Sequence, residues 1–343
     1  MKKTLFIDCG MGVAGDMLAS ALLDLFPDRD AVLAELNALG IPGVRYELSR
    51  KQKCGITGSH ITVYVGDQVE DEDLIGGGHG HDHGHDHDHD HDHEHDHDHD
   101  HDHDHPHDHE HDHDHPHDHE HDHDHERHHD HEHDHDHEHH HDHDHDHHHD
   151  HDHDAGSFEH THDGHAHTHS HAHYGMHDIE HIVWDLHLEK KVEENVLAVY
   201  QIIAGAESEV HGVPMNQIHF HEVGTMDAIA DITAVCYLMN KLAPDLVVTS
   251  PIQVGCGEVR CAHGILPVPA PATARILKGI PIYSDGTRGE MATPTGAALV
   301  RYFSTRFGSL PLMAVSETGY GMGTKDFGKA DCVRVLFGEE FKG

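Results

Sequence analysis

The sequence is poor in basic residues and has no long apolar run. Lysine and arginine together number 21 against 65 aspartates and glutamates, so the formal net charge is −44 at pH 7. Such a chain is not expected to bind nucleic acid, because phosphate backbones are bound by basic surfaces. No apolar run reaches the roughly 18 residues of a membrane-spanning helix. The apolar stretch at the N-terminus is too short for a signal peptide, so we expect a cytoplasmic protein with no membrane partner.

Cysteine is also scarce. The six cysteines are scattered without CxxC spacing, at positions 9, 54, 236, 256, 261 and 332. In a chain of this length the pattern indicates reduced thiols of a cytoplasmic protein and not a disulfide framework.

Histidine, in contrast, is abundant in one part of the chain. Residues 79–177 hold 48 of the 55 histidines and 33 of the 65 acidic residues, with Arg127 as the one basic residue. This window therefore carries 32 of the 44 net negative charges, and the other 244 residues form an ordinary, mildly acidic body. That body is large enough for one large domain or two small ones.

Between positions 79 and 154 the sequence alternates almost strictly between His and Asp or Glu. With so few apolar residues, the tract cannot offset the entropy lost on ordering, so we expect a disordered insertion in a loop. Imidazole is a good ligand for Ni, Zn, Cu and Co, and the carboxylates attract cations. We interpret the tract as a high-capacity metal buffer with no unique site. There are two alternatives. The tract is either a solvated linker without a role or a metal store that does not serve the folded body.

Strands and helices alternate in the body, which predicts an α/β fold. We divide the chain into an N-terminal α/β segment, residues 1–69, a disordered metal-binding insertion, residues 70–175, and a second α/β segment, residues 176–343. The strand order cannot be predicted. Expected strands are residues 3–8, 44–51, 60–65, 246–249, 280–283, 315–317 and 332–336, with a short extended piece at 218–223. Expected helices are residues 16–26, 30–39, 176–187, 189–211, 225–242, 269–277 and 293–307.

A glycine-rich turn follows the first strand and fits GxGxxG at residues 10–15. Dinucleotide binding, and hence NAD chemistry, is one interpretation. It is weakened because Asp16 would place a carboxylate near the pyrophosphate, and because a second helix follows the first. We prefer a loop whose backbone amides bind a phosphate while Asp8 or Asp16 faces a metal ion. An ordinary tight turn is the alternative. The candidate binding residues are Asp8, Gly10, Gly12, Gly15 and Asp16.

The segment HFHEVG at residues 219–224 precedes a predicted helix. On an extended chain His219 and His221 share one face, and Phe220 points to the opposite, buried side. Asp227 and Asp231 stand four residues apart in the first turns of the helix. We therefore predict a metal site made of imidazoles and carboxylates, with the ligands His219, His221, Glu222, Asp227 and Asp231. An acidic residue that only stabilises the helix start is the alternative.

Three further segments are rich in glycine or proline. His263 stands at the start of an extended stretch with three alternating prolines. Thr293 is expected to cap a helix, where it, Thr295 and Gly296 offer a site for a phosphate or carboxylate. Residues 319–326 are expected to form another glycine loop with one cation. Each segment alone is explained by turn and capping chemistry. The presence of several such segments in one chain favours a functional role for them.

Together the motifs resemble those of one known family. In chain order they read DCGMGVAGDM, HFHEVGTMDAIAD, CAHGILPVPAPAT, GEMATPTGAAL and ETGYGMGTKD, and the histidine-rich insertion lies among them. They are similar to the nickel-insertion proteins of the nickel-pincer cofactor pathway, the LarC family. The resemblance implies insertion of Ni(II) into pyridinium-3,5-bisthiocarboxylic acid mononucleotide, which forms the cofactor of lactate racemase and related enzymes.

The resemblance also implies cofactors and partners. CTP with Mg or Mn is expected for the full-length family, whose members continue into a C-terminal half that holds the CTP site. The chain is then either a fragment or a separately made first half that works with a second polypeptide, and a lactate racemase-type apoenzyme receives the product. Metalation at a ring carbon needs a base, for which His221 or His263 is the candidate. A non-catalytic nickel store or metallochaperone is the competing hypothesis.

Overall fold

The computed structural model describes residues 2–66, 68–69, 161–162, 165–166, 174–220 and 222–341. The chain divides into two compact units, Met1–His79 with Ala155–Gly343, and Gly80–Asp154. The predicted disordered insertion lies almost wholly outside the described residues. Within it, β5 (Thr161–His162) and β6 (His165–Ala166) form a small antiparallel pair. In the described part of the chain, no helix is both long and apolar enough to cross a membrane.

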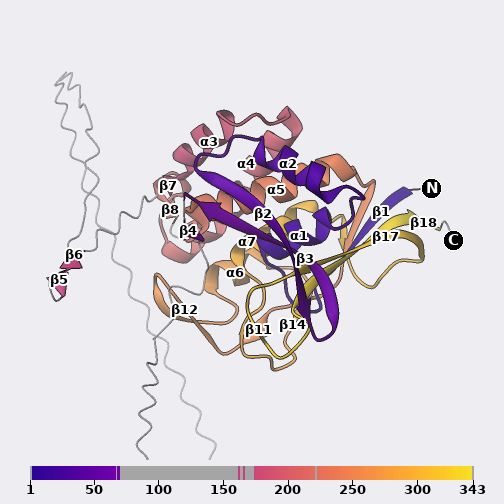
Figure 1. Ribbon diagram of the computed structural model, residues 1–343. Coiled ribbons are helices and arrows are strands. Elements are labelled where there is room, and N and C mark those ends of the chain that lie inside the picture. Colours follow the sequence, from indigo (N-terminus) through magenta and orange to yellow (C-terminus); the bar gives the residue numbers. More distant parts are fainter. Residues whose placement is uncertain are drawn as a thin grey trace, which may run out of the picture. The chain divides into compact units, whose positions relative to one another are not determined.

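A mixed sheet of eight strands runs through the first unit (Figure 1). Its strands in spatial order are β16 (Arg306–Phe307), β9 (Leu246–Thr249), β1 (Lys2–Asp8), β18 (Cys332–Glu340), β17 (Met313–Met322), β3 (Ile56–Val65) and β2 (Val44–Lys53), with β4 (Gln68–Val69) beside β3. β1 is parallel to β9 and antiparallel to β18, so the two ends of the chain pair at the centre of the sheet. This confirms the α/β class.

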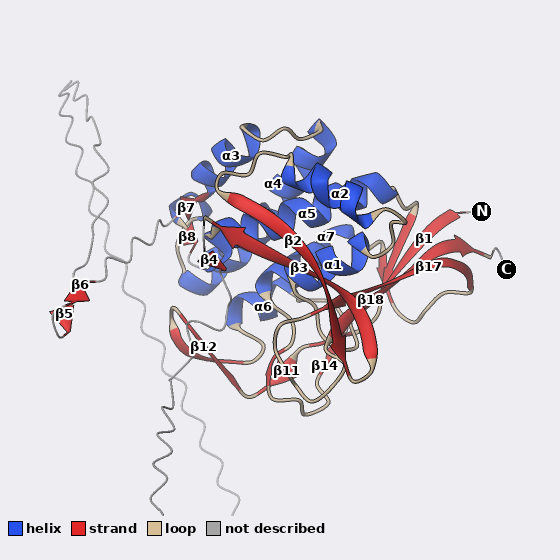
Figure 2. Cartoon of the chain, in the orientation of Figure 1, coloured by secondary structure: helices blue, strands red, loops and turns tan. Residues whose placement is uncertain are grey.

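Helices pack against the sheet and against one another, and in the view of Figure 2 they lie behind the β2–β3 hairpin. They are α1 (Gly15–Leu23), α2 (Arg29–Asn37), α3 (Met176–Trp184), α4 (Lys190–His211), α5 (Met226–Leu242), α6 (Pro271–Ile276) and α7 (Pro294–Phe303). α1 packs on β3, β17 and β18, α5 packs on α1, and α4 packs on α5, α6 and α7. α1 is apolar almost throughout and is buried from both sides, as expected for a helix between a sheet and a second helix layer.

Short strands complete the loops beyond the sheet. Their pairs are β7 (Tyr174–Gly175) with β8 (His219–Phe220), β10 (Ile252–Gln253) with β14 (Ile282–Tyr283), β11 (Gly255–Cys256) with β15 (Gly289–Glu290), and β12 (Glu258–Cys261) with β13 (Gly264–Pro267). The extended segment expected at residues 218–223 is confined to β8, because residues 222–224 turn into a 3-10 helix. All six cysteines are free thiols.

Residues 319–322 belong to a strand and not to the expected glycine loop. The glycines let α1 approach β17 closely. A Cβ added to Gly319 would lie 2.0 Å from the carbonyl oxygen of Ala21, and one added to Gly321 would lie 1.8 Å from that of Met17. The glycine spacing therefore reflects packing of a helix on a strand, which only a residue without Cβ allows.

The helix expected at residues 293–307 is wrong at its C-terminal end. α7 ends at Phe303, and residues 306–307 join the sheet as β16. Thr305 Oγ1 accepts a hydrogen bond from the Val247 amide at 3.2 Å, and Ser304 Oγ lies 2.6 Å from Thr249 Oγ1. These bonds to β9 turn the chain out of the helix and into strand pairing.

Candidate functional site

Three of the motifs meet at the loop that follows β1, residues 10–15, here called the Gly10 loop. Val13 and Ala292 form a parallel β-bridge, which joins the loop to the segment before α7. Gly12 has φ +88°, and a Cβ there would lie 1.9 Å from the Met291 carbonyl oxygen. A Cβ on Gly296 would lie 2.3 Å from the Val13 carbonyl oxygen. The glycines of both motifs thus allow two backbone segments to touch.

Three amides of the Gly10 loop donate hydrogen bonds within the protein. The Gly10 amide donates to Asp8 Oδ1 at 3.1 Å, the Gly12 amide to the Cys9 carbonyl at 3.0 Å, and the Val13 amide to the Met291 carbonyl at 2.8 Å. At the start of α7 the Gly296 amide donates to Thr293 Oγ1 at 3.2 Å, which confirms Thr293 as the N-cap. These four donors are therefore engaged within the protein and are not available to a phosphate.

The sheet also disfavours a dinucleotide site. In a doubly wound dinucleotide-binding domain the first strand lies among parallel strands. Here β1 has antiparallel β18 on one side. The Gly10 loop is thus a packing junction that places the N-terminus of α1, and NAD chemistry has no structural support.

A buried carboxylate lies against that N-terminus. Asp231, in the second turn of α5, is 7% exposed. A Cβ on Gly15 would lie 2.6 Å from Asp231 Oδ2, so only glycine lets the carboxylate approach the first residue of α1. Asp227 stands one turn earlier and is half-buried. The positive end of the helix dipole favours negative charge at this place.

Two buried tyrosines share the surroundings of these aspartates. Burial raises the pKa of Tyr46 and Tyr200 well above the ordinary value, and the charges of Asp231 and Asp227 raise it further. The Tyr46 hydroxyl donates to the Ala230 carbonyl at 2.7 Å, and the Tyr200 hydroxyl donates to the Val223 carbonyl at 3.3 Å. Both phenols therefore stay neutral and hold the start of α5 in place.

The other end of the Gly10 loop carries groups that the sequence did not reveal. Asp8 Oδ2 forms an ion pair with Arg334 of β18, and the Tyr283 hydroxyl donates to the Gly10 carbonyl at 3.3 Å. Asp8 thus has a cationic partner within the chain. Arg334 lies 326 positions from Asp8, and no local pattern marks such a pair.

An open cavity of about 480 Å³ lies in the same C-terminal part of the chain as Tyr283. Its walls are two loops, residues 285–288 and residues 326, 327 and 329. Lys329 Nζ contacts both Asp285 and Thr287. Hydrogen bonds from Lys329 and from Thr287 to the Asp285 carboxylate hold the pKa of Asp285 below its usual range. No local pattern predicts this cavity, since its walls are about 40 residues apart in the chain.

The predicted metal ligands are only partly described. Phe220 is buried and packs on Tyr200, with ring centroids 5.8 Å apart, and His219 is exposed, as the alternation predicted. His221 and the side chain of Glu222 lie outside the described residues. Among side chains that the structure does describe, no three of His, Cys, Asp or Glu are grouped so as to hold a metal ion. The five-residue site therefore stays a prediction.

His263 lies apart from the Gly10 loop. It stands in the turn of the β12–β13 hairpin, and its ring packs on that of His211, at the end of α4, with centroids 5.0 Å apart. Its role as a base stays a prediction that the contact with His211 does not support.

Comparison with known proteins gives a consistent result. Residues 5–342 match the family described as nickel insertion proteins. The pyridinium-3,5-bisthiocarboxylic acid mononucleotide nickel insertion protein of Geobacillus kaustophilus is 29% identical over 98% of this chain and 60% of its own length. A putative nickel insertion protein of Dictyoglomus thermophilum is 28% identical over 98% of this chain and 61% of its own. The chain thus spans about three fifths of these relatives.

A match of higher identity covers about half of the chain. The nickel insertion protein of Desulfitobacterium hafniense that carries the same substrate name is 44% identical over 48% of this chain and 41% of its own length. No solved structure matches the chain.

Proposed function

The chain belongs to the family of nickel insertion proteins, and from this premise we propose that it inserts Ni(II) into pyridinium-3,5-bisthiocarboxylic acid mononucleotide. That substrate is the one in the names of relatives from Geobacillus and Desulfitobacterium. The observation that carries the proposal is the meeting of separate motifs at one place, where the Gly10 loop, the carboxylates of α5 and the capped start of α7 are in contact.

Metal insertion needs ligands that bind Ni(II) and then release it. Imidazole and carboxylate ligands in an open arrangement meet this need better than a closed thiolate cage. We propose that the histidine-rich tract collects Ni(II) and that His219, His221 and Glu222, with Asp227 or Asp231, hold it beside the substrate. Asp231 is the residue that the structure supports most directly, because it is buried at the start of α1.

The same site has to position the organic substrate. We propose Asp8, Asp16, Gly15 and Thr295 as the residues that face it, since the amides of Gly10, Gly12 and Gly296 are engaged within the protein. Formation of the carbon–nickel bond requires loss of a ring proton, and we assign the base to His221 in preference to His263. His221 directly follows buried Phe220 and precedes α5, whereas His263 packs on His211.

We further propose that the reaction is of the lyase class, takes place in the cytoplasm and serves a lactate racemase-type apoenzyme. CTP with Mg or Mn, and a separate C-terminal half, remain expectations from the family resemblance. The resemblance places the CTP site in the C-terminal half, so we derive no step of this chain through CTP.

The test is reconstitution. Purified chain, substrate and Ni(II) are combined with and without CTP and Mg²⁺, and the nickel product is followed by its absorption spectrum and by mass. The variant His219→Ala with His221→Ala should lower product formation by roughly 100-fold or more, because a base or ligand is lost. His187→Ala serves as the matched control.

A nickel store or metallochaperone predicts a different outcome. Such a protein binds as many Ni(II) ions as the wild type after the double substitution and forms no product in any arm. Full activity per folded molecule in the double variant would move the site away from residues 219–222.

A further inference from the structure

Two histidines of α3 face each other across one helical turn. His177 Nε2 lies 3.1 Å from His181 Nε2, with ring centroids 4.4 Å apart and ring planes at 81°. Residues four apart lie on one face of a helix. Ile179 and Val183 bury the opposite face, which leaves both imidazoles exposed. The packing of α3 thus fixes the two rings side by side in solvent.

The separation of the two nitrogens matches that of a chelate. With metal–nitrogen bonds of about 2.0–2.1 Å, nitrogens 3.1 Å apart subtend about 100° at the metal. This value lies between the right angle of square-planar or octahedral ions and the tetrahedral angle. We propose that His177 and His181 form a binding site for a divalent transition-metal ion, distinct from the predicted ligands at residues 219–231.

The charges around the pair favour a cation. Asp178 and Glu180 lie on the same helix, and Asp178 Oδ2 accepts a hydrogen bond from the Gly175 amide at 2.7 Å. Near its N-terminus a helix dipole opposes positive charge, and carboxylates in the first turns offset this effect. A neutral hydrogen bond between exposed imidazoles competes with water and contributes little. A metal ion is the stronger reason for placing the rings together.

The site is open. Within the described part of the chain, no third His, Cys, Asp or Glu joins the pair to complete a metal-binding group. Two imidazoles leave several coordination positions to water or to an incoming ligand. Such a site exchanges its ion readily, unlike a closed structural site.

Its position suggests a role in transfer. α3 begins at Met176, at the C-terminal end of the histidine-rich window. Gly175, which precedes the helix, pairs with His219 in the β7–β8 ladder. The pair therefore stands one short strand away from the first predicted metal ligand. That the ion is Ni(II) in transit from the tract rests on the proposed function, whereas the existence of the site does not.

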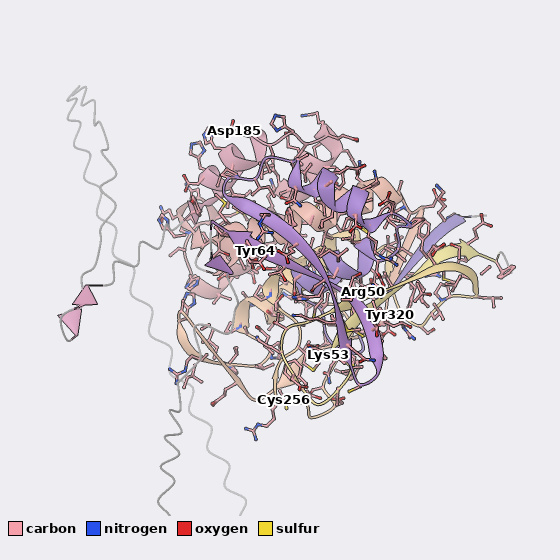
Figure 3. The ribbon with its side chains drawn as sticks, viewed as in Figure 1. Arg50, Lys53, Tyr64, Asp185, Cys256 and Tyr320 are labelled. Atoms are coloured by element: carbon pink, nitrogen blue, oxygen red, sulfur yellow. The ribbon has the colours of Figure 1, made fainter. Side chains whose placement is uncertain are left out.

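The chain contains its own reporter for this site. Trp184 is the sole tryptophan of the sequence, and its ring lies edge-on to His181 with centroids 5.4 Å apart. Figure 3 labels Asp185, which follows Trp184 at the end of α3. Ni(II) and Cu(II) quench the fluorescence of a nearby indole. Emission of the chain therefore reports metal bound near Trp184, and variants of the pair separate this site from the tract.

The experiment is a titration of the full chain with NiCl₂, and with CuCl₂ as a second probe, followed at Trp184. In His177→Ala with His181→Ala the midpoint of quenching should move to at least about tenfold higher metal, because the chelate is lost. His187→Ala, an exposed histidine three residues after the tryptophan, should keep the wild-type curve.

The single variant His177→Ala guards against damage to the helix, because it leaves the contact between His181 and Trp184 in place. It should shift the midpoint as well, with unchanged circular dichroism. Identical quenching curves for wild type and both variants would overturn the proposal and show that the tract alone brings metal to Trp184. Because the readout is binding, failure here leaves the reconstitution result untouched, and failure of reconstitution leaves this site standing.

Discussion

At the scale of single residues, the arrangement of Asp231 and Gly15 distinguishes a site from ordinary packing. Carboxylates are seldom buried, and this one lies where α1 begins. Gly15 has no side chain, and any Cβ there would collide with Asp231. The glycine and the aspartate therefore depend on each other, although 216 positions separate them.

We predict that Asp231→Asn separates activity from stability. The amide keeps the shape of the side chain but removes its charge, so nickel insertion should fall about 10- to 100-fold or more. The free energy of unfolding should change by less than about 2 kcal/mol. Product formation and urea denaturation measure the two quantities. Asp245→Asn, on an exposed carboxylate that accepts a hydrogen bond from the Lys3 amide, is the control. A variant as active as this control would remove Asp231 from the site.

At the scale of elements, β17 shows how a motif can serve packing. Gly319 and Gly321 face α1, and the Asp24 carboxylate near the end of α1 binds the same sheet. Asp24 accepts hydrogen bonds from the Tyr320 amide at 3.1 Å and from Ser59 Oγ at 2.8 Å, and it pairs with Arg50. Arg50 lies on β2 and Tyr320 on β17, the two strands on either side of β3 (Figure 3). The helix is thus held to the sheet by close backbone contact and by one buried carboxylate.

Gly321→Ala should be strongly destabilising. The added methyl would lie 1.8 Å from the Met17 carbonyl oxygen, and backbone cannot move aside as a flexible side chain would. We expect a loss of at least about 3 kcal/mol in the free energy of unfolding, or failure to fold. Gly308→Ala is the matched control, because a Cβ there meets nothing within 4 Å. Equal urea midpoints for the two variants would contradict this account of the packing.

A pH-dependent contact joins α2 to α5. Glu35 Oε2 lies 2.7 Å from Lys241 Nζ and accepts a hydrogen bond from the Tyr237 hydroxyl at 2.7 Å. The hydrogen bond from Lys241, followed by that from Tyr237, lowers the pKa of Glu35. A carboxyl whose pKa is lowered by folding stabilises the protein above its unfolded pKa of about 4.3, and the effect is lost as the pH falls through the folded value.

Glu35→Gln should therefore destabilise the protein by less than about 1 kcal/mol at pH 7, as expected for an exposed pair. The difference from wild type should shrink as the pH falls below about 4.3. Urea denaturation of both proteins at a series of pH values measures it. A difference that does not change over that range would show that the charge of Glu35 is not what joins the helices.

At the scale of the whole molecule, the histidine-rich tract and the folded body are separable units. The boundary of the second unit, Gly80–Asp154, nearly coincides with the alternating tract at residues 79–154. The body has its own continuous core, which includes residues from both sides of the insertion, such as Leu22 and Val199.

Deleting residues 80–154 should leave a protein with one cooperative thermal transition, because the described residues on both sides of the tract form one continuous core among themselves. Bound Ni(II) per chain should fall steeply, since most histidines are removed. Calorimetry and metal analysis after dialysis test the two statements. Loss of the cooperative transition would show that the insertion is part of the fold.

The sequence by itself determined what depends on neighbouring residues. The α/β class, the cap Thr293 and the burial of Phe220 all follow from patterns a few residues long. Periodicity and capping are local interactions, so they can be predicted without knowledge of the fold.

The tertiary structure alone decided which segments meet. The pairing of β1 with β18, the contact of Gly15 with Asp231 and the ion pair of Asp8 with Arg334 join residues hundreds of positions apart. Such contacts arise from the packing of the whole core, which no local pattern encodes. For the same reason similar glycine motifs have different roles, one forming the junction at the Gly10 loop and the other the contact surface of β17 for α1.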